Sequence, residues 1–139
     1  MQIKVKTPAK INLTLEIVGK RPDGFHDIKS IMQMINLYDY LTFDIEDSEE
    51  LTISLDGNNP KIPYNEKNIV YKAIKLYFEK ANVSPKKINV YLEKHIPSEA
   101  GLAGGSTNAA GTFLVLNKYF NNALSIEELH ELCARLGSD

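Results

Sequence analysis

The chain has 139 residues, 43% of them apolar and 24% charged, which is enough for one compact domain with a hydrophobic core. Its formal net charge of -2 gives no basic surface of the kind that nucleic-acid-binding proteins carry. No apolar run approaches the roughly 18 residues needed to cross a bilayer, so we expect no nucleic-acid and no membrane partner. The single cysteine, Cys133, leaves no internal disulfide and fits a reducing compartment, so we expect a cytoplasmic protein.

Alternating apolar residues predict β-strands in the first third of the chain. Apolar and polar residues alternate over 1–6, 11–17, 41–45 and 51–55, which is the period of a half-buried strand. A cluster of Asp, Gly, Asn and Pro at 56–60 then predicts a turn.

Three helices and one more strand are predicted in the rest of the chain. The first helix begins near Asn68 and ends before Pro85, and a strand follows it. The third helix opens at a capping box, Ser125 to Glu128, and stops at Gly137. Inward-facing residues are expected to be Val70, Ala73, Ile74 and Tyr77, then Ile88, Val90 and Leu92, then Ala109, Phe113, Leu116 and Phe120, and finally Leu129, Leu132, Cys133 and Leu136. Strands followed by strand–helix alternation indicate an α+β domain.

A glycine-rich segment, residues 100–107, separates the last predicted strand from the second helix. Gly101, Gly104 and Gly105 permit several backbone N–H groups to point at one anion, and a following helix adds the positive end of its dipole. The hydroxyls of Ser106 and Thr107 extend this candidate polyphosphate site. The segment matches neither the P-loop nor the G-x-G-x-x-G pattern, and a flexible turn before a helix is the alternative. Because the segment has no lysine, phosphoryl transfer would need a cation from elsewhere.

Four segments together resemble one family of small-molecule kinases. Residues 96–110 are similar to the P-x-x-x-G-L-x-G-S/G-S-S/T-x-A-A loop of the galactokinase, homoserine kinase, mevalonate kinase and phosphomevalonate kinase superfamily. Residues 8–13, 21–26 and 136–139 resemble signatures of the 4-diphosphocytidyl-2-C-methyl-D-erythritol kinases of the non-mevalonate isoprenoid pathway. The four motifs occur in the family's order over nearly the whole chain.

The resemblance implies a two-layer α+β fold like domain 2 of ribosomal protein S5. It also implies that residues 1–139 form one amino-terminal nucleotide-binding domain, truncated before its last elements. A ferredoxin-like second domain would be absent, so we expect this chain by itself to be inactive.

The resemblance also implies the chemistry, which is transfer of a phosphoryl group from ATP, with Mg²⁺, to the 2-hydroxyl of 4-diphosphocytidyl-2-C-methyl-D-erythritol. Asp139 matches the catalytic aspartate that accepts the hydroxyl proton, and Lys10 matches its partner lysine. Asn12 would orient the acceptor, while Phe25 and His26 would bind the cytosine ring.

The ATP-binding residues implied by the resemblance lie in three places. Asn68 and Lys94 would approach the adenosine end, although Asn68 could equally be a helix N-cap and Lys94 an exposed residue at a strand end. The phosphates would lie on Pro97, Ala100, Gly101, Leu102, Ala103, Gly104, Gly105, Ser106 and Thr107. Because the three histidines lack metal-ligand spacing, we expect no structural metal site.

Three alternatives remain open. Another superfamily member, such as a homoserine or mevalonate kinase, would not need Phe25 and His26. A module that binds nucleotide or RNA without catalysis would have no use for a paired lysine and aspartate. A hydrolase built from Ser106, His26 and Asp139 lacks the G-x-S-x-G context of a nucleophilic serine.

Overall fold

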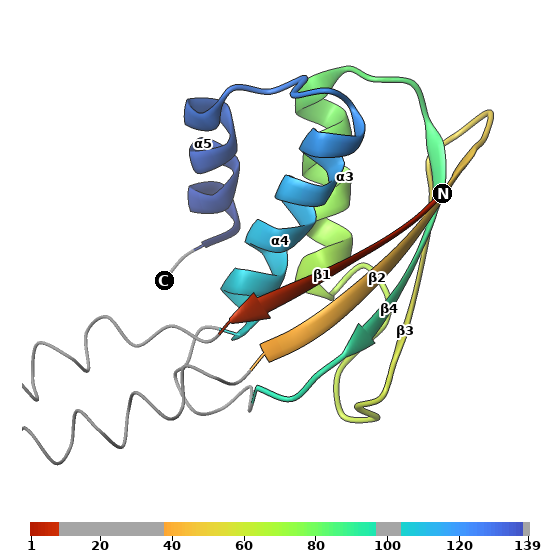
Figure 1. Ribbon diagram of the computed structural model, residues 1–139, viewed down its shortest axis with the longest axis vertical. Coiled ribbons are helices and arrows are strands. Elements are labelled where there is room, and N and C mark those ends of the chain that lie inside the picture. The colour runs from red at the N-terminus through yellow and green to blue at the C-terminus, as the bar shows by residue number, and fades with distance from the viewer. Residues whose placement is uncertain (9–37, 97–103, 138–139) are drawn as a thin grey trace, which may run out of the picture.

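The computed structural model describes residues 1–8, 38–96 and 104–137 (Figure 1). Its strands are β1 (Gln2–Pro8), β2 (Tyr38–Asp47), β3 (Thr52–Gly57) and β4 (Lys86–Glu93), and its helices are α3 (Ile69–Ala81), α4 (Gly104–Tyr119) and α5 (Ile126–Gly137). The α+β class and the order of these elements are as the sequence predicts. The strand predicted over 11–17 lies outside the described residues.

The strands form one sheet in the order β1-β2-β4-β3. Both the β1–β2 and the β2–β4 pairs are antiparallel, whereas β3 pairs with β4 in parallel. A parallel pair needs a crossover connection, and α3 provides it between β3 and β4. The alternation in the sequence fixes which side chains face inward, and Leu41, Phe43, Ile88 and Leu92 are all buried.

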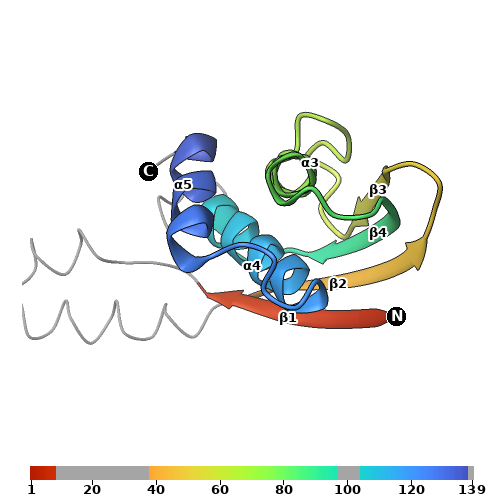
Figure 2. The ribbon, with the colours of Figure 1, turned by 90° about the horizontal axis from the view of Figure 1, so that it is seen from above.

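The helices lie on one side of the sheet. Figure 2 shows α3 and α4 side by side on this face, where they bury the inward-facing strand residues between sheet and helices. Helix α5 packs on α3 and α4. None of the helices in the described part of the chain is long and apolar enough to cross a membrane.

Local sequence signals set the helix ends. The Asn68 side chain caps α3 by accepting a hydrogen bond from the Val70 N–H at 2.9 Å. Helix α3 ends before Pro85, as predicted, because Asn82 adopts a left-handed conformation with φ 55°. The capping box is also confirmed, since Ser125 Oγ accepts from the Glu128 N–H at 3.2 Å and Glu128 Oε1 accepts from the Ser125 N–H at 2.9 Å.

Helix α4 lies unusually close to β1 at one point. A Cβ atom added at Gly111 would come within 2.5 Å of Thr7 Cγ2, so the backbone of α4 approaches this threonine as only a glycine allows. The predicted stripe on α4 is buried at Ala109, Phe113 and Leu116. Phe120 departs from it, because the helix ends at Tyr119 and the ring is only half-buried.

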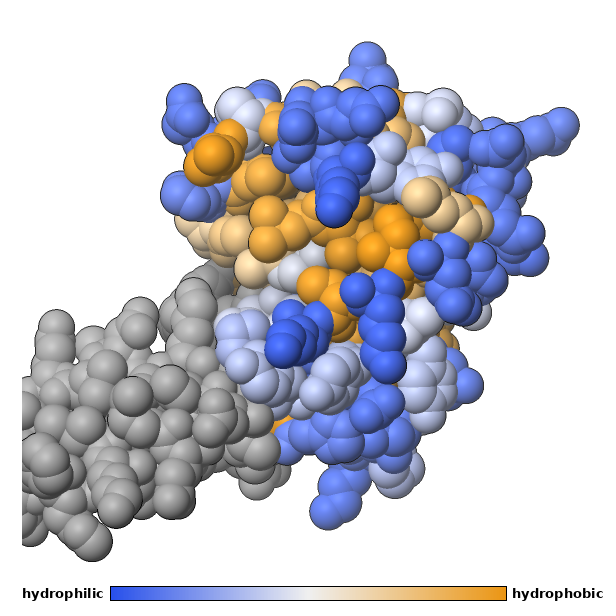
Figure 3. All heavy atoms as spheres, viewed as in Figure 1, coloured by the Kyte–Doolittle hydropathy of each residue, from blue (hydrophilic) through white to orange (hydrophobic). Residues whose placement is uncertain are grey.

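Apolar side chains also reach the surface on the side seen in Figure 1, where hydrophilic residues lie among and around them (Figure 3). The large apolar side chains that are most exposed among the described residues are Met1, Tyr91, Leu114 and Ile126, and Leu114 on α4 is 61% exposed. Cys133 is half-buried against the core, which agrees with its prediction as a core residue.

Candidate functional site

Polar side chains replace apolar ones at one end of the sheet. Thr7, Asp39 and Lys94 continue the inward-facing positions of β1, β2 and β4. Thr7 and Asp39 are partners in the β1–β2 register. Lys94 is one step beyond the last β2–β4 pair, Tyr40 with Glu93, and therefore opposite Asp39. The sheet thus brings three polar side chains into one row beneath the helices.

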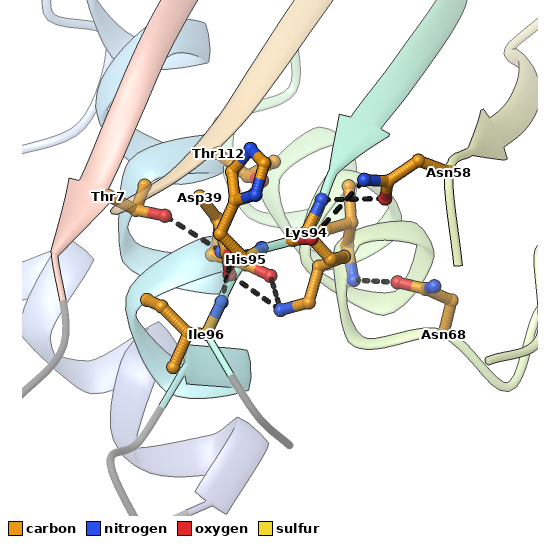
Figure 4. A network of polar contacts seen from close by, with 10 residues as sticks. Thr7, Asp39, Asn58, Asn68, Lys94, His95, Ile96 and Thr112 are labelled. Carbon is orange, nitrogen blue, oxygen red and sulfur yellow. Dashed lines mark hydrogen bonds and ion pairs between the residues drawn. The ribbon is translucent and has the colours of Figure 1, made fainter. Parts of the chain in front are cut away.

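The Asp39 carboxylate, which is 0% exposed, is the centre of this row (Figure 4). Its Oδ2 accepts from Lys94 Nζ at 2.6 Å and from Asn108 Nδ2 at 3.0 Å. Its Oδ1 accepts from the backbone N–H groups of His95 at 2.7 Å and Ile96 at 2.9 Å. Both carboxylate oxygens therefore have two donors, which uses the acceptor sites of an ionised carboxylate.

Asn108 of α4 completes the group. Its Oδ1 accepts from Lys94 Nζ at 2.7 Å, and its Nδ2 donates to Thr7 Oγ1 at 2.7 Å as well as to Asp39. We call Thr7, Asp39, Lys94 and Asn108 the Asp39 network. All its members except Lys94 are buried residues, and the Lys94 side chain is itself only 7% exposed.

Asp39 is ionised in this environment. Burial raises the pKa of its carboxyl, but the hydrogen bonds from the Ile96 N–H, the Lys94 ammonium and the His95 N–H outweigh burial and hold the pKa below its usual value of 3.8. A buried carboxylate and a buried ammonium are stable together because each neutralises the other and both are hydrogen-bonded.

Backbone contacts fix Lys94 independently of its ammonium group. Asn58, next to the end of β3, accepts from the Lys94 N–H at 2.8 Å and donates its Nδ2 to the Lys94 carbonyl at 3.3 Å. The Asn58 N–H also donates to the Leu92 carbonyl at 3.1 Å. The polar row is therefore anchored across the whole end of the sheet.

Residues that bind the Asp39 carboxylate lie before and after residues 97–103 in the sequence. His95 and Ile96 immediately precede this stretch, and Asn108 follows it within the second turn of α4. The first turns of α3 and α4 point toward the same end of the sheet (Figure 1). A helix N-terminus presents free N–H groups and a positive dipole end, which suits a phosphate group.

Most of the site residues expected from the sequence lie outside the described residues. These are the two catalytic candidates, the three substrate-binding candidates and the first part of the phosphate-binding segment: Lys10, Asp139, Asn12, Phe25, His26, Pro97, Ala100, Gly101, Leu102 and Ala103. Their roles stay predictions.

Two expected ATP-binding residues have defined contacts. Asn68 is the N-cap of α3, and its Nδ2 donates to the Pro63 carbonyl at 2.7 Å. The N-cap alternative is therefore confirmed. The alternative for Lys94, an exposed residue at a strand end, is wrong, because this side chain turns inward to Asp39. The ATP-binding role of both residues stays a prediction.

The second half of the glycine-rich segment belongs to α4. The helix already begins at Gly104 rather than after the segment, so Gly104, Gly105, Ser106 and Thr107 form its first turn. Thr107 is buried, at 6% exposed.

Three members of the Asp39 network, Thr7, Asp39 and Asn108, are not among the residues that the sequence suggested for the site. The signal for two of them was present, because Thr7 and Asp39 keep the inward parity of their strands and a buried carboxylate requires a partner. Nothing in the periodicity of α4 singles out Asn108. Its importance depends on tertiary contacts with β1, with β2 and with Lys94 directly after β4.

Two hollows in the described surface lie away from these residues. One is on the open face of the sheet, at Thr42, Asp44, Asn89 and Tyr91, and the other is beside α3 and α5, at Lys72, Leu76 and Leu136. Neither contains a site residue expected from the sequence. Of the site residues expected from the sequence, Lys94 lies in the Asp39 network at the end of the sheet.

Curated relatives match the whole chain at high identity. The chain is 47% identical over 137 residues to a 4-diphosphocytidyl-2-C-methyl-D-erythritol kinase of Clostridium beijerinckii, covering 99% of this chain and 48% of the relative. It is 47% identical over 139 residues to the protein of the same description from Bacillus cereus, covering 100% of this chain and 47% of the relative. The chain thus spans about half the length of the curated relatives it matches.

Solved structures share the fold at lower identity. A homoserine kinase from Cytophaga hutchinsonii aligns with TM-score 0.63 and 20% identity, covering 73% of this chain and 32% of that one. A 4-(cytidine 5'-diphospho)-2C-methyl-D-erythritol kinase aligns with TM-score 0.53 and 24% identity, covering 100% of this chain and 47% of that one. A mevalonate kinase from Methanococcus jannaschii aligns with TM-score 0.59 and 17% identity, covering 98% and 46%.

The part of the chain from α3 onward carries the family assignment. Residues 68–139, just over half of the sequence, match the family described as GHMP kinases N terminal domain. This region contains the α3 cap, the β4 end with Lys94, the glycine-rich segment and α4 with Asn108. The chain belongs to the GHMP kinase family, of which it carries the amino-terminal domain.

Proposed function

We propose that this chain forms the ATP-binding part of a kinase that phosphorylates the 2-hydroxyl of 4-diphosphocytidyl-2-C-methyl-D-erythritol. The observation that carries the proposal is the 47% identity to relatives of that description over the whole chain. The matched length spans the stretches 8–13 and 21–26, in which the sequence resembles signatures of these kinases.

In this proposal the ATP phosphates lie at the start of α4. The helix begins at Gly104, and the N-terminus of a helix suits an anion because it presents backbone N–H groups and the positive end of the helix dipole. Mg²⁺ would accompany ATP and would be held largely by phosphate oxygens. The described residues contain no group of three or more His, Cys, Asp or Glu side chains suited to a metal ion.

The phosphoryl transfer would use residues from both ends of the chain. The substrate 2-hydroxyl oxygen attacks the γ-phosphorus, the bond to the bridging β–γ oxygen breaks, and ADP leaves. Asp139 takes the hydroxyl proton, and Lys10 stabilises the negative charge that develops. Asn12 orients the acceptor, while stacking on Phe25 and a hydrogen bond from His26 select the cytosine ring.

The proposal is tested by assaying the full-length natural protein with ATP and each candidate acceptor. We expect ADP production with 4-diphosphocytidyl-2-C-methyl-D-erythritol and none above background with homoserine or mevalonate. Lys10→Ala and Asp139→Asn should each lower kcat by about 10²-fold or more, as loss of a group that acts on the transition state does. Undiminished turnover in both variants, or a preference for homoserine or mevalonate, would contradict the assignment.

The cytosine pocket needs its own test. Phe25→Ala removes a stacking surface worth on the order of 1–3 kcal/mol, so KM for the acceptor should rise by about tenfold or more while KM for ATP stays unchanged. An equal rise in both constants would argue against a pocket at this position.

A further inference from the structure

The two oxygens of the Asp39 carboxylate hold different parts of the chain. Within the described part of the chain, the donors to Oδ1 are the backbone N–H groups of His95 and Ile96, directly before residues 97–103. Oδ2 accepts from Asn108, which follows that stretch in α4, and from Lys94. A single buried group on β2 therefore links the end of β4 to the start of α4.

This link acts on the helix end rather than on the helix middle. Asn108 lies one turn beyond Gly104, where α4 begins, and its side chain bonds to β1, β2 and the residue after β4. Successive turns of an α-helix are joined by hydrogen bonds between residues four apart, so a fixed Asn108 also constrains the direction of the N–H groups in the first turn.

Stability alone does not account for a charged pair at this place. Replacing a buried ion pair by well-packed apolar residues is often neutral or stabilising, and the neighbouring inward positions of the same strands hold Leu41 and Leu92. What an apolar pair lacks is direction, because only hydrogen bonds set the distance and orientation of three elements at once.

We propose that Asp39 is a positioning residue of the nucleotide site, whose carboxylate holds the end of β4 and the start of α4 in the arrangement that binds ATP phosphates. The inference rests on the proposed function in one respect, namely that α4 starts at the phosphate site. Asp39 acts through Asn108 and the backbone at 95–96, without contact to the nucleotide.

The first test compares Asp39→Asn with the double variant Asp39→Asn/Lys94→Met in the full-length natural protein. In the single variant an amide NH₂ replaces one carboxylate oxygen, so the Lys94 ammonium loses its counter-charge. The double variant removes that buried charge and should regain most of the lost thermal stability. In both variants KM for ATP should rise by about tenfold or more, because a displacement of about 1 Å of the start of α4 would misplace the groups that bind the ATP phosphates. KM for the acceptor should rise by less than about twofold.

The matched control is Asp47→Asn. Asp47 is on the same strand and also pairs with a lysine, Lys86, but this pair lies at the other end of β2 and Asp47 is exposed. Its KM values should equal those of the wild type. If the double variant regains stability and also has the wild-type KM for ATP, Asp39 is structural only and the proposal is overturned.

A milder pair of variants decides the matter if Asp39→Asn does not fold. Thr7→Val removes the acceptor of Asn108 Nδ2 at nearly constant volume, and Thr7→Ser keeps the hydroxyl. Thr7→Val should raise KM for ATP by about threefold, in keeping with loss of one hydrogen bond, and Thr7→Ser should restore it. Equal KM values in Thr7→Val and the wild type would overturn the proposal.

Nucleotide titrations separate this inference from the proposed function. The affinity for N-methylanthraniloyl-ATP is measured by fluorescence without any acceptor. Wild-type binding that Asp39→Asn weakens, together with no turnover of the proposed acceptor, would refute the function and leave the positioning role intact. Turnover of that acceptor with unchanged nucleotide affinity in Asp39→Asn would refute the positioning role alone.

Discussion

Helix α4 carries a buried asparagine near each end, and the two differ in the charge of their partners. Asn108 bonds to the ion pair of Asp39 and Lys94. Asn117 accepts from the Tyr77 hydroxyl at 2.7 Å and from the Leu124 N–H at 2.9 Å, and donates to the Leu124 carbonyl at 3.0 Å. Burial raises the pKa of Tyr77 to about 12, so this hydroxyl is neutral at physiological pH.

The comparison teaches that anchoring a connection to α4 requires no charge. The neutral side chain of Asn117 helps to hold the turn after α4, where Asn121 and Asn122 have φ of 56° and 60°, together with backbone hydrogen bonds such as that from the Asn122 N–H to the Asn117 carbonyl. The Asp39 network includes the desolvation of two charges, which is expensive. This desolvation cost arises at the start of α4, where the glycine-rich segment leads into the helix. Its location favours a functional reason for the charged pair.

The largest expected effect is on stability in Asp39→Asn. Breaking a buried pair leaves the Lys94 ammonium uncompensated, so the free energy of unfolding should fall by about 3–5 kcal/mol. Urea unfolding followed by circular dichroism measures this change. A loss below about 1 kcal/mol would mean that the pair is solvated like an exposed one, and the contrast with Asn117 would then disappear.

The pH dependence of that loss should follow the Asp39 carboxyl. Since its pKa is lowered from 3.8 in the folded state, its stabilisation is fully present above the unfolded value and is lost as pH falls through the folded value. The difference in unfolding free energy between the wild type and Asp39→Asn should be constant above about pH 5 and shrink below pH 3.8. A difference that grows on acidification would contradict a lowered pKa for this carboxyl.

At the neutral end of α4 the expected effect is smaller. Asn117→Ala leaves the Tyr77 hydroxyl and both backbone groups of Leu124 without partners, which should cost about 2–3 kcal/mol. Unlike Asp39→Asn, this substitution should leave KM for ATP unchanged. The loss in unfolding free energy that it causes should be the same at about pH 3 and about pH 5, because the amide, hydroxyl and backbone groups involved do not titrate in that range. A raised KM for ATP would remove the functional distinction between the two ends.

The smallest effect is expected at the exposed cap of α5. Ser125→Ala removes the acceptor for the Glu128 N–H, and loss of an N-cap costs about 1 kcal/mol. Ser125→Asp, which keeps an acceptor, is the matched control and should unfold at nearly the wild-type denaturant concentration. Equal destabilisation by both substitutions would show that the hydroxyl bond is not what stabilises the helix start.

The fold was largely predictable because its signals are local. Alternation in β2 and β4, the cap at Asn68 and the box at Ser125 each place an element without knowledge of its neighbours. The end of α4 was less predictable, since Phe120 continues the apolar stripe after the helix has stopped at Tyr119. The sheet order also had no local signal, because it depends on which strands pair.

The candidate site residues were suggested by resemblance and not by periodicity, and most of them stay predictions. The motifs include Lys10, Asp139 and the glycine-rich segment. Asp39 and Asn108, which bond to residues before and after this segment, are specified by no motif that a short stretch of sequence would reveal. Lys94 shows why, since as a lysine next to a strand end it resembles an exposed residue until Asp39 is known to lie opposite. A rule that asks which polar residues continue an inward-facing pattern on adjacent strands would have found the pair.

Gly111 has a consequence for how this domain could change its sequence. The space that a side chain at 111 would need is filled by the Thr7 methyl group, while the Thr7 hydroxyl serves Asn108. The Thr7 methyl group therefore fills the space beside Gly111, and the Thr7 hydroxyl accepts the hydrogen bond from Asn108. Serine at position 7 would remove this methyl group and keep the acceptor, so an alanine at 111 would then meet only ordinary contacts, at 3.8 Å to Val5 Cγ1 and 3.9 Å to Cβ of residue 7. The residue that is tolerated at position 111 therefore depends on the residue at position 7, although the two are far apart in the chain.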